Sequence, residues 1–548
     1  LISCLIQNSA SRSLKSAMAL LLFSALLECP RAGESTPVAP QQRSGTSYYL
    51  DCSASQNGDG TRSSPWNSVS TANAFTLRPG DHLLLKRGTA CAGPLTPRGS
   101  GAANSAITID AYGTGAQPVI SGGSAEEALK LFNQQYWEIN NLEITGGKRY
   151  GVYVSGDIPR SSINHIYLRN LNVHNATYTS TWRSDSGEVF LSTRGAGQIL
   201  NDVLIDGVTA HDSHVSEGIF VSAGGAWIEK DGAPQPLGSN VTVQNSTAHD
   251  IYGDGILIAE VKNGLVQRNV VYHSGLCPKC TGSTPVGLWE WYCHTCTVQF
   301  NESYANQSWG GDGGDFDIDF YDDNNVVQYN YGHDSAGYCV AIYGAGGRVS
   351  HDNIFRFNVC ANDGRRSDLS KQGEVYLHTW DGGSLDGVQI YNNTIYWNPA
   401  SNAAAFTSDA VYSGSDPRFF KNNIVYATVP GVIQITAGIV LDNNIYWTTA
   451  AAGNWQIGGA AYTSFDDYQM AEKQDAHSFY ADPKLSDADY HSDGRPTTAL
   501  HLLPGSPASR AGANVCSGIS GCSMGTQDFW GDESRAGHVY DIGAYQEP

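Results

Sequence analysis

The chain has 548 residues, of which 41% are hydrophobic and only 16% are charged, and its formal net charge is −21. That charge argues against nucleic acid or an anionic membrane surface as a partner, because both attract basic surfaces. The 61 glycines and 29 tyrosines beside only 3 methionines favour short strands and tight turns over long exposed helices. We therefore expect an all-β protein.

The first 33 residues have the pattern of an export signal. Two basic residues precede the apolar run Ala19–Leu27, which suits a signal-peptide core and is too short for a membrane span. Met18 is an alternative start, and a lipoprotein signal ending at Cys29 is an alternative to cleavage near residue 33. With a short linker over 34–46, the sequence predicts a secreted protein, extracellular or periplasmic, with no membrane span.

A repeated phrase runs through most of the chain from residue 47 onward. It consists of alternating apolar residues followed by Asn, as in Val266–Asn269, Val298–Asn301, Val327–Asn330 and Ile354–Asn358. Each unit is too short to bury a core alone, but stacked units would bury one continuous column of side chains. Asn at equivalent turns can form a ladder of amides from coil to coil and tolerates left-handed backbone. The repeat therefore predicts a parallel β-helix rather than a propeller or a leucine-rich solenoid.

Motifs at both ends of this region resemble a known superfamily. Tyr48–Cys52 and Leu77–Asp81 are similar to an N-terminal coil, and Asp541–Tyr545 is similar to a closing segment, of pectate-lyase-like proteins. The resemblance spans roughly 47–548 and implies a single-stranded right-handed parallel β-helix (solenoid). It also implies an N-terminal cap, an irregular C-terminal segment over about 480–548, and activity on carbohydrate. The superfamily includes lyases, hydrolases, epimerases and adhesins, so these motifs leave the chemistry open.

Ten cysteines follow the export signal, an even number that fits an oxidising compartment. Their proximity in sequence predicts the disulfides Cys52–Cys91, Cys339–Cys360 and Cys516–Cys522. The other four have a CxxC…CxxC spacing that suits either two disulfides or a structural zinc ion: Cys277, Cys280, Cys293 and Cys296. Export favours disulfides, and we expect a stapled loop over 277–296 rather than a catalytic centre.

The strongest chemical motif is an acidic strand in which Asp315, Asp317 and Asp319 alternate with apolar residues. In a strand, the apolar residues face the core and all three carboxylates face solvent. Side chains two apart lie roughly 7 Å from each other, so repulsion should raise the pKa of at least one acid. A raised acid beside an ionised carboxylate is what glycoside hydrolysis requires, and we predict these residues to be catalytic.

Aligning the coils by their inward apolar residues predicts which side chains share a face with the acidic strand. Two tryptophans fall one coil before it, and Glu374, Tyr376 and His378 fall two coils after it. Aromatic faces and acids along one groove suit a sugar chain, whose C–H faces stack on rings. We predict Glu374 and His378 as further catalytic candidates and Trp289, Trp291 and Tyr376 as substrate contacts. Secondary acidic candidates are Glu217, Asp254 and Asp381.

A calcium-dependent polysaccharide lyase acting on a uronic-acid polymer is the alternative enzyme. It would use three cations near the groove to bind substrate: Arg365, Arg366 and Lys371. Its calcium ligands would come from five acids: Asp315, Asp317, Asp319, Asp322 and Asp323. A hydrolase would need no cofactor. A second alternative is a carbohydrate-binding or adhesive β-helix without catalysis, and in each case we expect a polysaccharide partner and a monomer.

Overall fold

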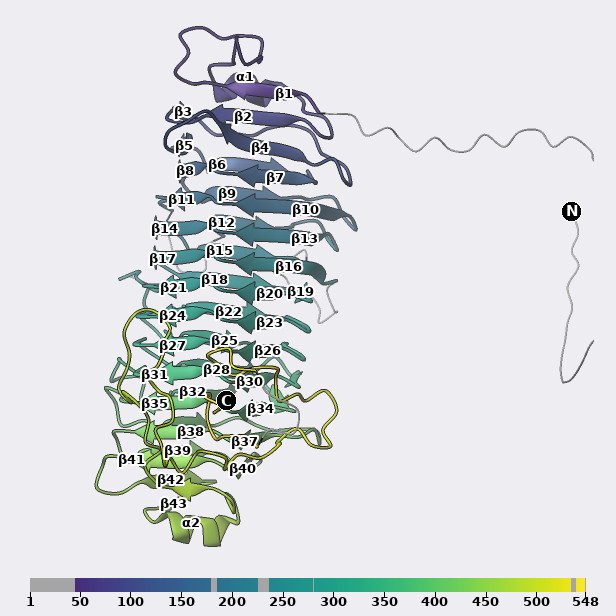
Figure 1. The fold of residues 1–548 in the computed structure, drawn as a ribbon. Helices are drawn as coiled ribbons and strands as arrows, with labels where there is room; N and C mark the ends of the chain where they lie inside the picture. The colour runs from purple at the N-terminus through teal and green to yellow at the C-terminus, as the bar shows by residue number, and fades with distance from the viewer. Residues whose placement is uncertain (1–44, 179–184, 225–235, 279, 534–538, 548) are drawn as a thin grey trace, which may run out of the picture. The chain divides into compact units, whose positions relative to one another are not determined.

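The structure is a computed structural model that describes residues 45–178, 185–224, 236–278, 280–533 and 539–547 (Figure 1). The predicted leader and all but the last two residues of the linker lie outside the described residues. The range Ser44–Pro548 forms one compact unit, and its first strand begins at Ser47. Within the described residues, three large sheets of 15, 14 and 13 strands make up this unit.

Each coil of the chain contributes one strand to each sheet in turn, and the order of strands in each sheet follows the order of coils. The first sheet contains β1 (Ser47–Leu50), β2 (His82–Lys86), β4 (Ile107–Tyr112), β7 (Trp137–Asn140), β10 (Ser162–Arg169), β13 (Ile199–Asp206), β16 (Gly238–Gln244), β19 (Val261–Lys262), β20 (Leu265–Gln267), β23 (Thr297–Gln299), β26 (Val326–Gln328), β30 (Ile354–Arg356), β34 (Gln389–Tyr391), β37 (Phe419–Lys421) and β40 (Val440–Asp442). The second contains β3 (Ala90–Ala92), β5 (Val119–Gly123), β8 (Glu143–Gly146), β11 (Asn172–His174), β14 (Thr209–Ser213), β17 (Thr247–Ile251), β21 (Val270–Tyr272), β24 (Glu302–Tyr304), β27 (Tyr331–His333), β31 (Val359–Ala361), β35 (Thr394–Trp397), β38 (Ile424–Ala427), β41 (Ile445–Thr448) and β44 (Phe479–Tyr480).

The third sheet carries the candidate site. It contains β6 (Glu127–Phe132), β9 (Tyr150–Ser155), β12 (Gly187–Ser192), β15 (Glu217–Ser222), β18 (Asp254–Ala259), β22 (Leu288–Trp291), β25 (Phe316–Ile318), β28 (Val340–Gly344), β32 (Val375–Thr379), β36 (Phe406–Ser408), β39 (Gly431–Ile435), β42 (Asn454–Ile457) and β43 (Ala460–Tyr462). Within these sheets the pairing is parallel, and β43 is the exception, because it pairs antiparallel with β42. A small sheet pairs β29 (Val349–His351) with β33 (Ser384–Asp386). The predicted fold class, a right-handed parallel β-helix, is confirmed.

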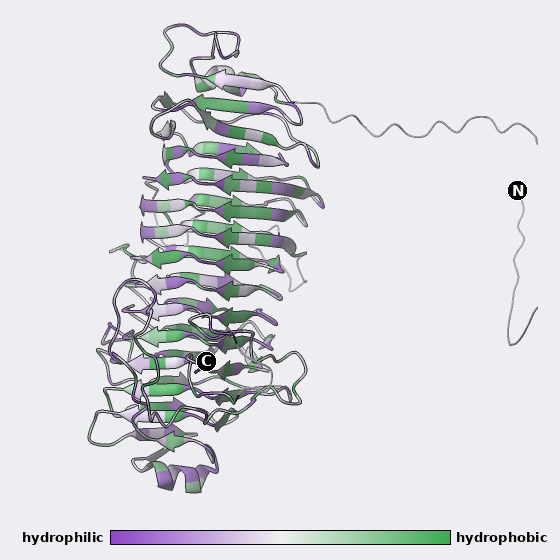
Figure 2. Ribbon diagram, in the orientation of Figure 1, coloured by the Kyte–Doolittle hydropathy of each residue, from purple (hydrophilic) through white to green (hydrophobic). Residues whose placement is uncertain are grey.

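Alternating apolar residues fill the interior of the helix, and Figure 2 shows them concentrated in the strands. In the first sheet, Val266, Val298, Val327, Phe355 and Ile390 occupy successive coils in one register and are almost fully buried. Because each coil supplies an equivalent side chain at the same height, neighbouring coils bury each other's apolar faces. The predicted repeat is therefore the unit of the core.

The predicted asparagine ladder is also confirmed. Each amide nitrogen donates to the amide oxygen of the next coil at 3.0–3.4 Å, in the order Asn269, Asn301, Asn330, Asn358, Asn393, Asn423 and Asn444. These side chains are nearly or wholly buried. The left-handed residue, however, is the one before each ladder asparagine, for example Phe300 at φ 57° and Tyr329 at φ 57°. The ladder asparagines accept the backbone N–H groups that follow these strained residues, which stabilises the turn.

The two ends of the solenoid are closed differently. At the N-terminal end, Trp66 and α1 (Val69–Ala74) contribute to the main core, which agrees with the predicted cap. At the other end, α2 (Phe465–Glu472) begins at Ser464, whose hydroxyl accepts the N–H of Asp467 at 3.2 Å. Among the described residues, neither helix is long and apolar enough to cross a bilayer.

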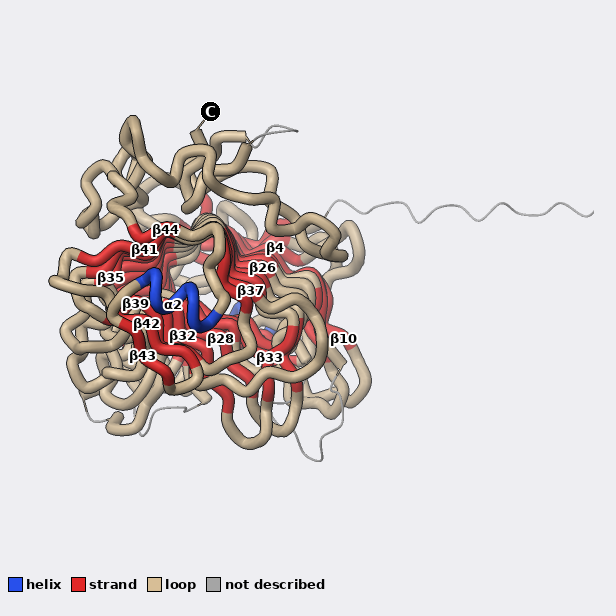
Figure 3. The backbone as a smooth tube through the Cα atoms, turned by 90° about the horizontal axis from the view of Figure 1, so that it is seen from below, coloured by secondary structure: helices blue, strands red, loops and turns tan. Residues whose placement is uncertain are grey.

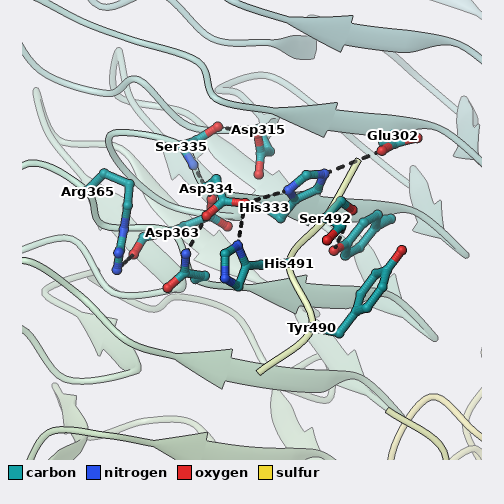
Figure 4. Close-up of polar contacts among 12 residues, drawn as sticks. Glu302, Asp315, His333, Asp334, Ser335, Asp363, Arg365, Tyr490, His491 and Ser492 are labelled. Atoms are coloured by element: carbon teal, nitrogen blue, oxygen red, sulfur yellow. Dashed lines mark hydrogen bonds and ion pairs between the residues drawn. The ribbon is translucent and has the colours of Figure 1, made fainter. Parts of the chain in front are cut away.

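After β44 the chain has no further strand among the described residues and returns along the outside of the helix, as Figures 1 and 3 show. Buried polar contacts hold this segment in place. The Gly494 N–H donates to Glu302 at 2.5 Å, and the Asn392 amide donates to the carbonyl of Asp541 at 3.0 Å. In Figure 4, His491 lies beside Asp334, which also binds the buried His333. The irregular C-terminal segment predicted by the resemblance is therefore present.

The cysteines follow the sequence prediction only in part. The disulfides Cys52–Cys91, Cys339–Cys360 and Cys516–Cys522 are formed as predicted. A fourth disulfide joins Cys277 to Cys280. Cys293 and Cys296 are free thiols buried in the core. Of the two disulfides expected among the four cysteines of 277–296, one is therefore formed and the other is not, and the alternative of a four-cysteine zinc site is wrong, because the second pair lies inside the β-helix.

We predict that Asn301→Ala lowers the melting temperature strongly. The substitution leaves the Val266 carbonyl and the Asn269 N–H without their side-chain partners. Two unpaired buried groups cost about 2–6 kcal/mol together, at about 1–3 kcal/mol each. Differential scanning calorimetry against Asn402→Ala, at an exposed asparagine, checks this. Equal midpoints for the two variants would contradict a stabilising role for the ladder.

Candidate active site

A cavity of about 410 Å³ opens over the third sheet, which is within the size range of pockets for small ligands. Its lining comes from six consecutive coils and combines acids with aromatic rings. The described residues that line it are Glu217, Asp254, Thr284, Val286, Trp289, Trp291, Asp312, Asp317, Asp319, Phe320, Tyr343, Gln372, Tyr376, His378 and Trp380. None of these is Lys or Arg.

Strand register explains why these residues meet. Trp289 pairs with Asp317, Asp317 with Ala341, and Ala341 with Tyr376, so one outward column crosses four coils. In the next column Tyr343 pairs with His378. The alignment predicted from sequence, with the tryptophans one coil before the acidic strand and Tyr376 and His378 two coils after it, is confirmed.

Aromatic rings form a continuous wall on one side of the cavity. Tyr376 stacks on His378 with ring centroids 5.6 Å apart, and His378 stacks on Trp380 at 5.5 Å. Phe320 meets Trp380 edge to face at 5.5 Å and Trp291 at 5.9 Å. These rings present flat apolar faces next to carboxylates, which is the combination that binds sugar rings.

Three acids of the central strand region lie together in the cavity: Asp312, Asp317 and Asp319. Tyr343 donates to Asp312 at 2.8 Å, and Tyr338 donates to Asp317 at 3.4 Å. Burial, followed by repulsion from Asp319 and Asp312, raises the pKa of Asp317 well above its ordinary value. Burial and these two neighbouring acids therefore favour the protonated form of Asp317.

Two further acids line the cavity on neighbouring strands. Glu217 in β15 pairs in register with Asp254 in β18. Asp254 accepts the N–H of Val286 at 2.7 Å, which holds the segment that leads into β22. Asp381, the third secondary candidate, is exposed and does not line the cavity.

Asp315 does not face solvent with Asp317 and Asp319, so that prediction is wrong. It is fully buried and accepts hydrogen bonds from Ser335 at 2.6 Å and from Asn306 at 2.9 Å, as Figure 4 shows for Ser335. The strand is only three residues long and begins after left-handed Gly313, at φ 81°, so the alternation does not extend back to Asp315. Phe320 also departs from the pattern, because it lies beyond the strand end and lines the cavity.

Glu374 was likewise predicted to face the groove, and the structure contradicts this. It precedes β32, is fully buried, and does not line the cavity. Burial and then repulsion from Asp363 raise the pKa of Glu374 well above its ordinary value. Burial likewise raises the pKa of Asp363 to about 7. These two acids belong to an interior polar cluster with Asp315 rather than to the cavity.

The three cations predicted to bind substrate lie outside the cavity lining. Arg365 donates to the carbonyl of Asp363 at 3.4 Å, as drawn in Figure 4, and Lys371 is exposed. Arg366 donates to the carbonyls of Ser308 at 2.6 Å and Gly310 at 2.9 Å. Arg366 therefore holds the loop that leads to Asp312 and does not face a ligand.

The five acids predicted as calcium ligands are distributed over four separate environments. Asp317 and Asp319 line the cavity, and Asp315 is in the interior cluster. Asp322 accepts the Cys293 N–H at 2.5 Å inside the core, whereas Asp323 pairs with His351 at 3.4 Å on a turn. They do not surround a common point, and the predicted shared calcium shell is not formed.

Sequence reasoning missed Asp312, Tyr343, Gln372 and Trp380 as lining residues. Asp312 lies in the glycine-rich run 310–314, and its left-handed φ of 53° turns it towards Tyr343 from outside any strand. Gly314 must be glycine, because a β-carbon there would lie 2.2 Å from the ring of Tyr338. The run of glycines on both sides of Asp312 was the sequence signal that could have identified this acid.

Solved structures of other proteins share the fold of this chain. No family model matches the chain. A GH136 lacto-N-biosidase from Eubacterium ramulus superposes with a TM-score of 0.51 at 18% identity, covering 73% of this chain and 68% of that one. A pectate lyase superposes over 92% of this chain at 14% identity with a TM-score of 0.40. The likeness to the lacto-N-biosidase structure shows the fold of this chain, a parallel β-helix.

One curated protein is similar in sequence. It is a lacto-N-biosidase from Bifidobacterium longum subsp. longum, 23% identical over 550 residues. The alignment covers 80% of this chain but 33% of that protein, so this chain spans about a third of the length of its curated relative.

We predict that Asp317→Asn raises the melting temperature at pH 8 and changes it little at pH 4. An acid whose pKa is raised by folding costs no stability below its unfolded pKa of about 3.9 and costs stability progressively as the pH rises. Thermal melts of Asp317→Asn at both pH values, compared with Asp381→Asn at an exposed acid, check the sign. A lower midpoint than wild type at pH 8 would contradict the raised pKa.

Proposed function

We propose that the protein is a glycoside hydrolase that binds an oligosaccharide or the end of a polysaccharide in the cavity over β22, β25, β28 and β32. The observation that carries the proposal is the lining itself: five carboxyl groups and a wall of aromatic rings, with no Lys or Arg among the described lining residues. The similarity to lacto-N-biosidases supports the same class of reaction.

The lining disfavours the lyase alternative. A lyase must neutralise a uronate carboxylate and remove the adjacent proton, which calls for a cation beside the substrate. Arg365, Arg366 and Lys371 are the cations that sequence placed near the groove, and they lie outside the lining. The negative cavity would also repel a polyuronate. A neutral glycan is therefore the substrate class that we propose, with hydrolysis that requires no calcium.

We assign the two carboxyl roles of glycoside hydrolysis to Asp312 and Asp319. One carboxyl group protonates the leaving oxygen, and the other acts as base or nucleophile. Tyr343 donates to Asp312, and the Phe320 N–H donates to Asp319 at 2.8 Å. A hydrogen bond therefore holds each of the two carboxyl groups in position. Asp317 has one carboxylate oxygen buried without a hydrogen bond, and burial together with repulsion from Asp319 and Asp312 raises its pKa. In this proposal Asp317 tunes the pair and does not react.

We also propose that the protein is exported and that it is a monomer. Four disulfides among the described residues support folding in an oxidising compartment, extracellular or periplasmic. A non-catalytic adhesin is disfavoured, because burying like charges together is costly unless they serve a reaction.

Digestion of neutral and uronic-acid glycans by the purified full chain tests the reaction class. We expect new reducing ends from neutral substrates, no ultraviolet absorbance from unsaturated sugars, and no effect of a calcium-selective chelator. An absorbing product whose formation stops with that chelator would establish the lyase alternative instead.

Conservative variants test the assignment of the acids. We expect Asp312→Asn and Asp319→Asn each to lower kcat/KM by about 10²–10⁴, the usual contribution of a general acid or base. Asp317→Asn should lose about tenfold or less, because in this proposal the Asp317 carboxyl group does not transfer a proton or bond to the substrate. Circular dichroism verifies folding of each variant. A loss for Asp317→Asn as large as that for Asp319→Asn would move the catalytic role to Asp317.

A further inference from the structure

A second cluster of chemically reactive groups lies behind the cavity, inside the solenoid. Glu290, Cys293 and Cys296 each direct one ligand atom to the same point, and these atoms all lie within 4.8 Å of one another. All three residues are at most 1% exposed. Glu290 alternates in β22 with Trp289 and Trp291, so the strand presents the tryptophans to the cavity and the carboxylate to the interior.

Hydrogen bonds within the protein leave several oxygen atoms at this cluster without a partner. Both carboxylate oxygens of Glu290 are buried without a hydrogen-bond partner, and so is Oδ2 of Asp322. The Cys296 sulfur accepts the Gly264 N–H at 3.2 Å, whereas the thiols have only long contacts as donors, from Cys293 to the carbonyl of Ile258 and from Cys296 to that of Val261, both at 3.6 Å. Unpaired buried carboxyl groups are costly and rare in native proteins. A group that satisfies them at this point would remove that cost.

Asp322 lies next to the cluster. Its Oδ1 accepts the Cys293 N–H at 2.5 Å, which leaves Oδ2 as the atom without a hydrogen bond. Two sulfur atoms and two carboxylates are thus available in the buried interior. Four donors of this type suit tetrahedral zinc, since thiolates select soft cations, whereas calcium requires six to eight oxygen ligands.

We propose that Glu290, Cys293, Cys296 and Asp322 form a structural zinc site in the interior of the β-helix. The ion would connect β22, the turn after it, and the turn after β25 in the next coil. It would thereby fix the strand that presents Trp289 and Trp291 to the cavity. The site differs from the four-cysteine arrangement predicted from sequence, because Cys277 and Cys280 form a separate disulfide.

A disulfide between Cys293 and Cys296 is the chemical alternative, because the same CxxC spacing is oxidised at Cys277 and Cys280. A disulfide would consume both sulfur ligands and leave Glu290 and the free oxygen of Asp322 unsatisfied. Metal content and thiol state therefore distinguish the two possibilities directly, and neither readout depends on enzymatic activity or on the proposed function.

The first experiment uses wild-type full chain purified without chelators. Inductively coupled plasma mass spectrometry should give one zinc per chain. Alkylation after unfolding with a zinc chelator, followed by peptide mass spectrometry, should label Cys293 and Cys296 while Cys277 and Cys280 remain linked. A Cys293–Cys296 disulfide, or free thiols without a stoichiometric soft metal, overturns the proposal. Cobalt exchange should give a thiolate charge-transfer band, and its absence in cobalt-loaded protein overturns it as well.

Variants then test the oxygen ligand with a matched control. Glu290→Gln should raise the zinc Kd by at least about tenfold, and a chelator should lower its melting temperature less than that of wild type. Cys277→Ser/Cys280→Ser removes the other CxxC pair and should keep one zinc with unchanged affinity. Equal zinc affinity for Glu290→Gln and wild type, or loss of zinc from the Cys277→Ser/Cys280→Ser variant, would overturn the assignment. The wild-type measurements decide the question if Glu290→Gln does not fold.

Discussion

The register between successive coils is the constraint on which the rest of this structure depends. Parallel backbone pairing fixes the height of each coil, and the buried asparagine ladder fixes the turn at which each coil passes from the first sheet to the second. Once the register is set, residues about 30 positions apart become neighbours. Trp289, Asp317 and Tyr376 lie along one face for this reason alone, because no local interaction in the chain brings them together.

The protein can bury acids close to one another because the stacked coils hold the backbone of each acid in place. Asp317 lies beside Asp312 and Asp319, and Glu374 lies beside Asp363, so burial and repulsion both act against their ionised forms. Each such group reduces the free energy of unfolding at neutral pH. The apolar faces that neighbouring coils bury against each other offset that cost.

Two clusters of buried acids lie in the interior of the β-helix near the site. Behind the cavity, Glu290 and Asp322 lie with two thiols, and Asp315 lies in an interior cluster with Ser335 and Asn306. Both clusters are attached to the short strands β22 and β25, whose outward residues line the cavity. Contacts on the inner face of these strands therefore restrict the motion of the side chains that their outer face presents to the cavity.

The sequence by itself determined the repeat, the fold class, the ladder, three disulfides and the face shared by Trp289, Asp317 and Tyr376, because each follows from period-two alternation and coil alignment. Only the tertiary structure decided where that alternation stops. Asp315 and Glu374 are buried although each directly precedes its strand, which is three residues long in one case and five in the other, and Asp312 lines the cavity from a left-handed φ of 53°. The sequence pattern does not record the strand ends, since they depend on contacts with the neighbouring coils.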